Sequence, residues 1–248
     1  MNIALIGYGK MGKAIEQIAI ATGHTISVKI DATSDLYKQK DELQRSDVAI
    51  EFTQPESAYQ NILTCFDLDI PVVCGTTGWL EKMPLVKKIC LDKNKSFFYA
   101  SNYSIGVNIF FEVNKLLAEI MNKHSSYDRI LLEENHHLMK LDAPSGTAIT
   151  IAEQMLSRID RLKSWTAFDA ADREDNHRKQ NPADLPIYSV READVPGTHC
   201  VKYLSAEDEI EIIHKAHNRT GFAKGALTVA LWLVGKKGFY GMEDLLSL

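Results

Sequence analysis

The sequence has 248 residues, is 45% hydrophobic and 25% charged, and carries a net charge of −5. This composition excludes a mainly disordered chain, and the acidic balance argues against broad electrostatic binding to nucleic acid or to an anionic membrane. The longest apolar run, 226–234, is far shorter than the roughly 20 residues of a membrane span. Because the N-terminus has no basic leader and the four cysteines form no CxxC pair, we expect a cytoplasmic protein with reduced thiols.

Short apolar runs alternate with amphipathic segments in the first part of the chain. The apolar runs predict strands at 3–6, 25–31, 48–53, 71–75 and 96–100. Helical periodicity and its end signals predict helices at 10–22, 55–66 and 80–92. This alternation favours a parallel sheet with helices on both faces.

The pattern changes after residue 102. It predicts helices at 107–123, 145–158 and 222–236, and strands at 129–134, 187–190, 199–204 and 209–216. The last three strands are typical of an antiparallel sheet, and the polar segment 169–184 is expected to be a mobile loop. The sequence therefore predicts an α/β fold, with a Rossmann-type parallel-sheet dinucleotide-binding domain plus a second α+β domain with a mostly antiparallel or mixed sheet.

A GxGxxG motif follows the first predicted strand and opens the first predicted helix. In such a motif Gly7 permits the tight turn, Gly9 lets the backbone approach a pyrophosphate, and Gly12 lets the helix pack close to the strand. Asp31 ends the second predicted strand, where a carboxylate accepts hydrogen bonds from ribose hydroxyls. The alternative is a structural glycine turn with a solvated aspartate, but the position between strand and helix favours dinucleotide binding. The residues predicted to contact the cofactor here are Gly7, Tyr8, Gly9, Lys10, Met11, Gly12 and Asp31.

Two further segments follow predicted strands of the parallel sheet, GTTG at 75–78 and ASNY at 100–103. Ligands of such sheets bind beyond the carboxyl ends of the strands. Both segments are therefore expected to contact the cofactor, although GTTG alone indicates only a turn. The expected contacts are Gly75, Thr76, Thr77, Ala100, Ser101, Asn102 and Tyr103.

The densest group of reactive side chains lies at 134–147, beside a Pro-Ser-Gly-Thr turn that opens a predicted helix. His136 and His137 carry imidazoles, which titrate near neutral pH and suit proton donation. Lys140 could hold a carboxylate or stabilise a developing negative charge. Gly146 and Thr147 would present N–H groups to an anion at the helix start.

Two structural alternatives apply to this cluster. One is a solvated charged loop with an N-cap at Ser145, which accounts for any single residue but not for the whole group. The other is a metal centre, but adjacent histidines lack an ordinary zinc-ligand spacing and no cysteine lies nearby, so no metal site is predicted. Because neighbouring side chains on a strand point to opposite faces, the two histidines need not share one role.

These motifs together resemble those of the 4-hydroxy-tetrahydrodipicolinate reductase family, also called dihydrodipicolinate reductases, of the diaminopimelate route to lysine. The similar segments span essentially the whole chain and are GYGKMG from Gly7, FTQPES from Phe52, GTTG from Gly75, ASNYSIGVN from Ala100, HHLMKLDAPSGTA from His136, VPGTH from Val195 and EIIHKAHNRTGFAKGALTVALWL from Glu211. The string from His136 to Thr147 is highly specific to that family.

The resemblance implies a nicotinamide-dependent reduction of a cyclic, dicarboxylated imine precursor to tetrahydrodipicolinate. It implies that His136 is the proton donor and that Lys140 is a second catalytic residue. It also implies a small-molecule dicarboxylate as the partner, no nucleic acid or membrane, and a homotetramer formed through the second sheet. The implied dinucleotide-binding domain is 1–103 with 219–248, and the implied substrate-binding and oligomerisation domain is 104–218. The residues implied to hold the substrate are His137, Lys140, Ser145, Gly146 and Thr147.

The cofactor is expected to be NADH or NADPH, with NADH at least as good. The carboxylate of Asp31 accepts a hydrogen bond from a free 2′-hydroxyl and repels a 2′-phosphate, and no arginine occurs between Asp31 and Arg45. Lys29 and Lys38 lie near enough in the sequence to permit use of both cofactors.

Two other functions stay open at this point. Another Rossmann oxidoreductase, acting on an amino acid or a sugar, would have to use the PSGT segment differently. A non-catalytic redox-sensing regulator would bind the dinucleotide without turnover, but the sequence shows no basic recognition helix that would favour it.

Overall fold

The computed structural model describes residues 1–31, 34, 36–169, 181–218 and 220–247. The chain forms two compact units, one of Met1–Ile105 with Thr220–Leu248 and the other of Gly106–Arg219. Among the described residues, no helix is both long and apolar enough to span a membrane.

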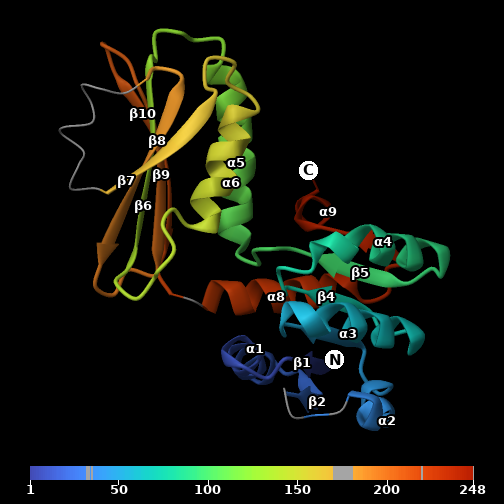
Figure 1. Cartoon of the computed structure of the whole chain (residues 1–248). Coiled ribbons are helices and arrows are strands. Elements are labelled where there is room, and N and C mark those ends of the chain that lie inside the picture. The colour runs from blue at the N-terminus through green and yellow to red at the C-terminus, as the bar shows by residue number, and fades with distance from the viewer. Residues whose placement is uncertain (32–33, 35, 170–180, 219, 248) are drawn as a thin grey trace. The chain divides into compact units, whose positions relative to one another are not determined.

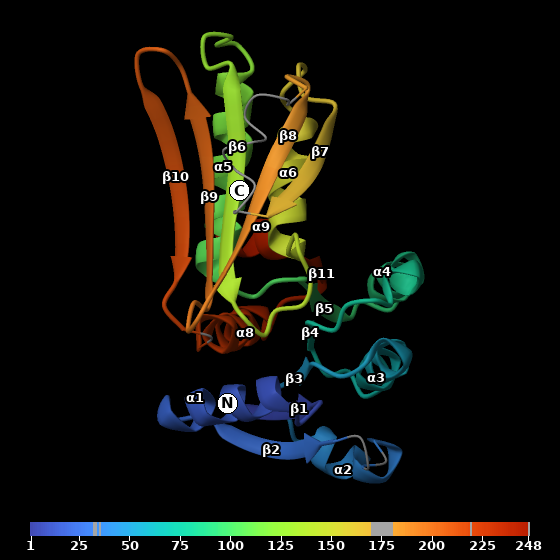
Figure 2. The ribbon, with the colours of Figure 1, turned by 60° about the vertical axis from the view of Figure 1, so that its left-hand side comes forward.

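The first unit is built on a six-stranded sheet in which all neighbouring strands are parallel. In spatial order the strands are β11 (Gly238–Tyr240), β5 (Ser96–Tyr99), β4 (Val72–Cys74), β3 (Val48–Glu51), β1 (Asn2–Ile6) and β2 (Thr25–Ile30) (Figures 1 and 2). The chain moves from β1 outward to β2 and returns to β3 on the other side of β1. The strand order therefore reverses between β1 and β3, which is where ligands of such sheets bind.

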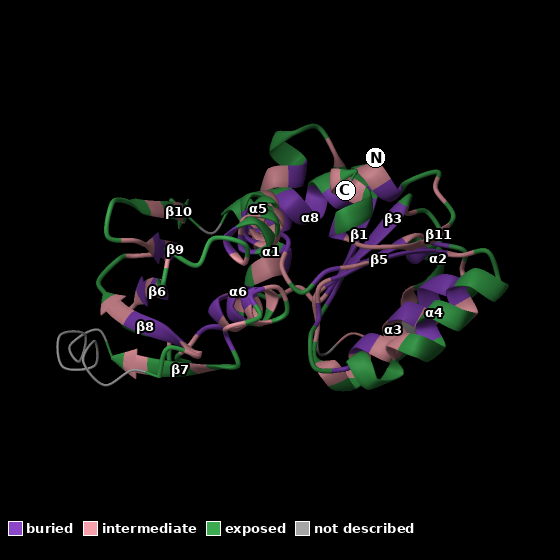
Figure 3. Cartoon of the chain, turned by 90° about the horizontal axis from the view of Figure 1, so that it is seen from above, coloured by how far each residue is buried: buried purple, intermediate pink, exposed green. Residues whose placement is uncertain are grey.

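Helices cover both faces of this sheet, because alternate strand residues feed two separate apolar cores. One core joins the sheet to α3 (Pro55–Asp67) and α4 (Met83–Asp92), and the other joins it to α1 (Lys10–Ala21) and α8 (Thr220–Leu233) (Figure 3). The short remaining elements are η1 (Leu36–Gln39), α2 (Lys40–Leu43), η2 (Leu80–Lys82) and α9 (Met242–Leu246). The predicted Rossmann-type architecture is confirmed.

The second unit is a five-stranded sheet packed on two helices. In spatial order its strands are β10 (Glu209–Ala216), β9 (Gly197–Leu204), β6 (Arg129–His137), β8 (Asp184–Glu192) and β7 (Ser164–Asp169) (Figure 2). The helices α5 (Ile105–Met121) and α6 (Gly146–Leu156) share an apolar core with Ile130 and Leu132 of β6. Because strand residues alternate between faces, Glu134 and His136 lie on this same helix-covered face.

The connectivity of the second sheet differs from its prediction. β8 and β9 are not neighbours, because β6 lies between them and pairs parallel with β8 and antiparallel with β9. β7 is also parallel to β8. The predicted antiparallel pairing is confirmed for β9 and β10 but is wrong for β8 and β9. The sheet is mixed, which is one of the two forms predicted. Hydrophobic patterns locate strands, but they do not fix which strands pair.

Some element boundaries also differ from their predictions. β6 continues past residue 134 to His137, so both histidines belong to the strand. β7 was not predicted, because most of its residues are exposed and it has no apolar run. β11 was not predicted either, because it has only three residues. Within the segment predicted to be a mobile loop, residues 170–180 lie outside the described part of the chain, while Asp169 and Asp184 belong to β7 and β8.

Candidate active site

The carboxyl ends of β1, β2 and β3 border a cavity of about 510 Å³ in the first unit. It lies at the reversal of strand order, where the sheet topology places a ligand. Four of the residues predicted to contact the cofactor line this cavity, namely Gly7, Tyr8, Gly9 and Asp31.

The backbone of the GxGxxG motif has the geometry that the motif predicts. Gly7 has a φ of +98°, and a Cβ there would lie 1.9 Å from the carbonyl oxygen of Phe52. A Cβ on Gly12 would lie 2.5 Å from the carbonyl oxygen of Gly7, so this glycine lets α1 begin close to β1. A Cβ on Gly9 would meet nothing within 4 Å, and the first amides of α1 beside it have no partner within the helix. The open space at Gly9 and the free amides at the start of α1 fit the pyrophosphate of a dinucleotide.

Asp31 lies at the end of β2, against the same cavity. Its Oδ1 atom accepts a hydrogen bond of 2.8 Å from the hydroxyl of Ser34, which holds the carboxylate near the position expected for the ribose. Lys29 forms an ion pair of 3.3 Å with Glu16 and lies over the ring of Tyr8. The side chain beside the expected ribose position is therefore a carboxylate, and the charge of Lys29 is already engaged.

The residues that line this cavity include none from the segments 75–78 and 100–103. Thr76 contacts a lining residue instead, because its hydroxyl accepts a hydrogen bond of 2.7 Å from the amide of Thr53. Tyr103 is buried, and its hydroxyl donates a hydrogen bond of 2.7 Å to a carbonyl oxygen of β4. Both residues thus have structural contacts within the first unit.

A buried carboxylate beside the cavity was not predicted. Glu51 ends β3 and is fully buried. It accepts hydrogen bonds from the hydroxyl of Thr53, from the side-chain amide of Asn61 and from the thiol of Cys74. Because Thr53 and Asn61 line the cavity, Glu51 holds two of its lining residues in place. The sequence feature that could have identified Glu51 is an acidic residue at the end of an otherwise apolar strand.

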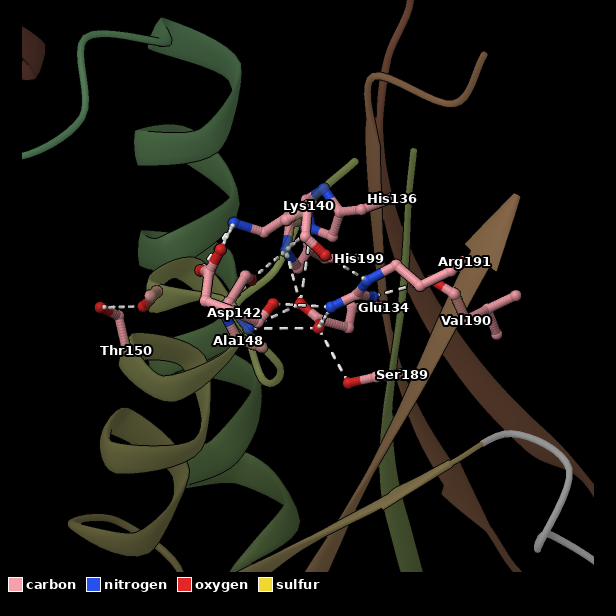
Figure 4. Close-up of polar contacts among 12 residues, drawn as sticks. Glu134, His136, Lys140, Asp142, Ala148, Thr150, Ser189, Val190, Arg191 and His199 are labelled. Atoms are coloured by element: carbon pink, nitrogen blue, oxygen red, sulfur yellow. Dashed lines mark hydrogen bonds and ion pairs between the residues drawn. The ribbon is translucent and has the colours of Figure 1, made fainter. Parts of the chain in front are cut away.

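In the second unit, polar groups converge on the buried carboxylate of Glu134 in β6 (Figure 4). Both of its oxygens accept hydrogen bonds of 3.1 Å from the amide of Ser145. Its Oε1 atom also accepts a hydrogen bond of 2.8 Å from the hydroxyl of Ser189 and lies 3.4 Å from Nη2 of Arg191. This carboxylate therefore connects β6 and β8 to the N-terminus of α6.

Two imidazoles face the other oxygen of this carboxylate. The Nε2 atom of His136 lies 3.4 Å from Oε2 of Glu134 and 3.4 Å from the Nε2 atom of His199. The Nε2 atom of His199 lies 3.8 Å from the same Oε2 and 3.2 Å from the hydroxyl of Ser145. Both imidazoles are buried. The arrangement places the predicted proton donor beside a carboxylate and a second histidine.

Strand register explains how residues far apart in the sequence form this cluster. Glu134 of β6 pairs with His199 of β9 on one side and with Ser189 of β8 on the other. His136 is the next residue of β6 on the same face. His137 follows it, and strand alternation directs its side chain to the opposite face. The structure thus brings His199 and Ser189 to the cluster, where no sequence motif had placed them.

Burial and hydrogen bonding shift the pKa of Glu134 in opposite directions. Burial alone raises the pKa of a carboxyl group, but the hydrogen bonds from His136, Ser145 and Ser189 outweigh it and lower the pKa of Glu134 to about 2. Burial and the neighbouring His136 lower the pKa of His199 to about 3. Both directions favour an ionised Glu134 beside a neutral His199 at neutral pH.

Lys140 lies in the loop between β6 and α6. Its Nζ atom is 2.8 and 2.7 Å from the two carboxylate oxygens of Asp142, and this contact lowers the pKa of Asp142. Arg191 anchors the loop by donating to the carbonyl oxygens of Lys140 and Asp142, at 3.3 and 2.7 Å. The loop holds Lys140 beside the cluster, as Figure 4 shows.

The N-terminus of α6 adds hydrogen-bond donors to this region. Ser145 is its N-cap, as predicted, and its hydroxyl accepts a hydrogen bond of 3.1 Å from the amide of Ala148. Gly146 and Thr147 belong to the first turn, where N–H groups have no partner within the helix. A Cβ on Gly146 would meet nothing within 4 Å, so the approach to this turn is open. Such a helix start favours a bound carboxylate.

Comparison with known protein families gives matches over both units. A family model described as dihydrodipicolinate reductase, N-terminus, matches residues 1–103, and one described as dihydrodipicolinate reductase, C-terminus, matches residues 106–246. The chain is 47% identical over 247 residues to a 4-hydroxy-tetrahydrodipicolinate reductase of Christiangramia forsetii, which covers 100% of this chain and 98% of that protein. It is 33% identical over 232 residues to a protein of the same name from Neisseria gonorrhoeae, with coverages of 93% and 80%.

Solved structures share the fold. A dipicolinate-bound dihydrodipicolinate reductase from Paenisporosarcina sp. matches with a TM-score of 0.74 at 19% identity, covering 99% of each chain. A probable dehydrogenase from Thermotoga maritima matches with a TM-score of 0.55 at 10% identity, covering 98% of this chain and 92% of that one. The arrangement of helices and strands is thus similar to that of dehydrogenases with very different sequences.

Proposed function

The chain belongs to the dihydrodipicolinate reductase family, and we propose that it reduces 4-hydroxy-tetrahydrodipicolinate to tetrahydrodipicolinate with NADH or NADPH. The observation that carries this proposal is the group formed by His136, Lys140 and the start of α6 around the buried carboxylate of Glu134. It offers a proton, a positive charge and N–H donors in one place. A reduction of a dicarboxylated imine requires all three.

We assign the proton of this reaction to His136. The overall conversion loses the 4-hydroxyl group of the substrate as water and gains one hydride and one proton. Addition of the hydride to the conjugated imine that the loss of water leaves puts negative charge on the ring, which a general acid must neutralise. Glu134 lies 3.4 Å from Nε2 of His136, and an ionised carboxylate next to an imidazole holds its ring in one orientation. His199 lies against the same nitrogen. Glu134 and His199 are therefore positioning residues for His136 in this proposal.

The start of α6 is the proposed site for one substrate carboxylate. The amides of Gly146 and Thr147 and the helix dipole favour an anion there, and Ser145 holds the turn through its cap. Lys140 would exchange its ion pair with Asp142 for the second carboxylate or for charge that develops during the reaction. His137 stays a proposed substrate contact on the family resemblance alone, because strand alternation directs its side chain to the sheet face opposite this cluster. The relative solved with dipicolinate, which is also a ring with two carboxylates, supports this assignment.

We infer that the nicotinamide dinucleotide binds in the cavity of the first unit. The turn at Gly7, the open space at Gly9 and the carboxylate of Asp31 fit its pyrophosphate and ribose. When bound, the cofactor supplies the hydride. The first unit is thus the proposed dinucleotide-binding domain, and the second the proposed substrate-binding and oligomerisation domain.

The enzyme is expected to use NADH at least as well as NADPH, because Asp31 repels a 2′-phosphate. Asp31→Ala should shift the ratio of kcat/KM values towards NADPH by about tenfold to a hundredfold, which corresponds to about 1–3 kcal/mol. The measurement is kcat/KM for both cofactors in each protein. Asp92→Ala, an exposed aspartate in the same unit and outside the cavity, is the control. A native preference for NADPH above about tenfold, or unchanged selectivity in Asp31→Ala, would show that Asp31 is not at the ribose.

The turnover rate is expected to depend on Gly197, because this residue lies against the imidazole of His136. A Cβ on Gly197 would lie 3.0 Å from Cε1 and 3.2 Å from Nδ1 of that ring. Gly197→Ala should displace the ring and lower kcat by roughly tenfold to a hundredfold, since a misplacement of about 1 Å can cost this much. Steady-state kinetics check the prediction. Gly221→Ala, whose Cβ would meet nothing within 4 Å, serves as control, and an unchanged kcat in Gly197→Ala would refute the effect.

We further propose a cytoplasmic homotetramer that assembles through the outer face of the five-stranded sheet. A groove of about 280 Å³ on that sheet is bordered by Glu133, Lys202, Glu211 and Ile213, and Ile213 is 58% exposed. These side chains lie on the face of the sheet opposite α5 and α6, because Ile210 and Ile212 of the same strand pack into the core on the helix-covered face. Light scattering should give the mass of four chains, and the mass of one chain would contradict the assembly.

Oxidation of NADH by substrate freshly generated with dihydrodipicolinate synthase tests the proposed function. We expect oxidation that requires both this substrate and the chain, and none with amino acids or sugars in its place. Turnover of an amino acid or a sugar instead would favour another Rossmann oxidoreductase. Cofactor binding without any turnover would favour the redox-sensing regulator.

A further inference from the structure

Three ligand atoms in the second unit have the spacing of a metal coordination shell. They are Oε2 of Glu134 and the Nε2 atoms of His136 and His199, which lie 3.4, 3.4 and 3.8 Å apart. A tetrahedral Zn²⁺ ion with bonds of about 2.0–2.2 Å holds its ligand atoms about 3.3–3.6 Å apart. The three atoms could therefore bind such an ion with movements of a few tenths of an ångström.

His199 directs one ring nitrogen into this cluster. The residue is 4% exposed, and its Nε2 atom points at Glu134, His136 and Ser145. Figure 4 shows both imidazoles directed at the carboxylate. Two histidines and one glutamate are the protein ligands of a known type of zinc site.

The carboxylate is held in place for this role. The amide of Ser145 and the hydroxyl of Ser189 donate to Glu134, and Arg191 lies on its Oε1 atom. Oε2 is thus the oxygen that faces the imidazoles. Hydrogen bonds of this kind, made by a ligand to its surroundings, fix its orientation towards a metal.

We propose that Glu134, His136 and His199 bind a zinc-type divalent cation, and that the bound cation inhibits the enzyme by occupying Nε2 of His136. The binding rests on the geometry of the three ligands alone. The inhibition rests on the proposed function, because it requires His136 to be the proton donor. Sequence spacing could not predict the site, because its third ligand comes from β9.

Titration calorimetry of the whole metal-free chain with Zn²⁺ tests the binding. One site per chain is expected, and His199→Ala should weaken it by at least about 10–100-fold, the loss seen when only an outer partner of a ligand is removed. His199→Gln removes the ligand at nearly constant volume, in case the alanine variant does not fold. His124→Ala, an exposed histidine of the same unit, should bind Zn²⁺ as the native chain does.

Turnover with and without Zn²⁺ tests the inhibition, which should be reversed by EDTA. Absence of a site in the titration, or equal affinity in the native chain and both His199 variants, overturns the proposal. Zinc bound at this site without loss of turnover overturns its inhibitory part and counts against His136 as proton donor. A metal-free chain that binds zinc but never turns over the substrate contradicts the proposed function, while the site itself stands.

Discussion

His136→Gln should lower kcat by about 10²–10⁴-fold, the scale of general acid catalysis. Glutamine fills much of the same space and can still contact Glu134, but its amide cannot deliver a proton at neutral pH. Because His136 is not among the residues that line the dinucleotide cavity, the affinity for NADH should stay native. The measurement is kcat with saturating substrate, together with NADH binding followed by fluorescence.

The control for this variant is His124→Gln, which removes an exposed imidazole from the same unit and should keep the native kcat. Circular dichroism and thermal unfolding establish that both variants fold. Near-native turnover in a folded His136→Gln protein would remove His136 from the mechanism.

Lys140→Ala should raise KM and lower kcat together, so that kcat/KM falls by about 10²–10³-fold. Its ammonium group now pairs with Asp142, and we expect the substrate to take that place. Loss of a charge that acts on both bound substrate and transition state affects both kinetic constants. The measurement is the full substrate dependence of the rate at saturating NADH.

Two further variants sharpen this prediction. Lys163→Ala removes an exposed lysine from the same unit and should leave both constants unchanged. Lys140→Arg keeps the charge but changes its shape and reach, so it should recover part of the loss in KM. If Lys140→Ala changed only the thermal unfolding temperature, Lys140 would be a surface residue without a part in the reaction.

The dinucleotide site could be predicted because its signals are local in the sequence. The turn at Gly7, the close approach at Gly12 and the helix that begins at Lys10 all follow from a few consecutive residues. Asp31 could be placed because it ends the strand beside β1. Glu51 was missed, since its partners Thr53, Asn61 and Cys74 come together only through the packing of β3, β4 and α3.

The cluster in the second unit could be predicted only in part, because half of it depends on strand pairing. His136, Lys140 and Ser145 lie in one segment, so their proximity is visible in the sequence. Ser189 and His199 reach Glu134 only because β8 and β9 flank β6. The sequence did not predict that β6 lies between β8 and β9, because hydrophobic patterns do not fix which strands pair.

Transfer of deuterium from NADH labelled at its hydride position tests most directly the claim that this chain reduces the substrate by hydride transfer. The substrate is generated freshly, and the tetrahydrodipicolinate formed is analysed by mass spectrometry. We predict that each product molecule gains one deuterium from labelled NADH, and that the rate of its formation collapses in His136→Gln. Product without deuterium, or no product at all from the native chain, would contradict the account.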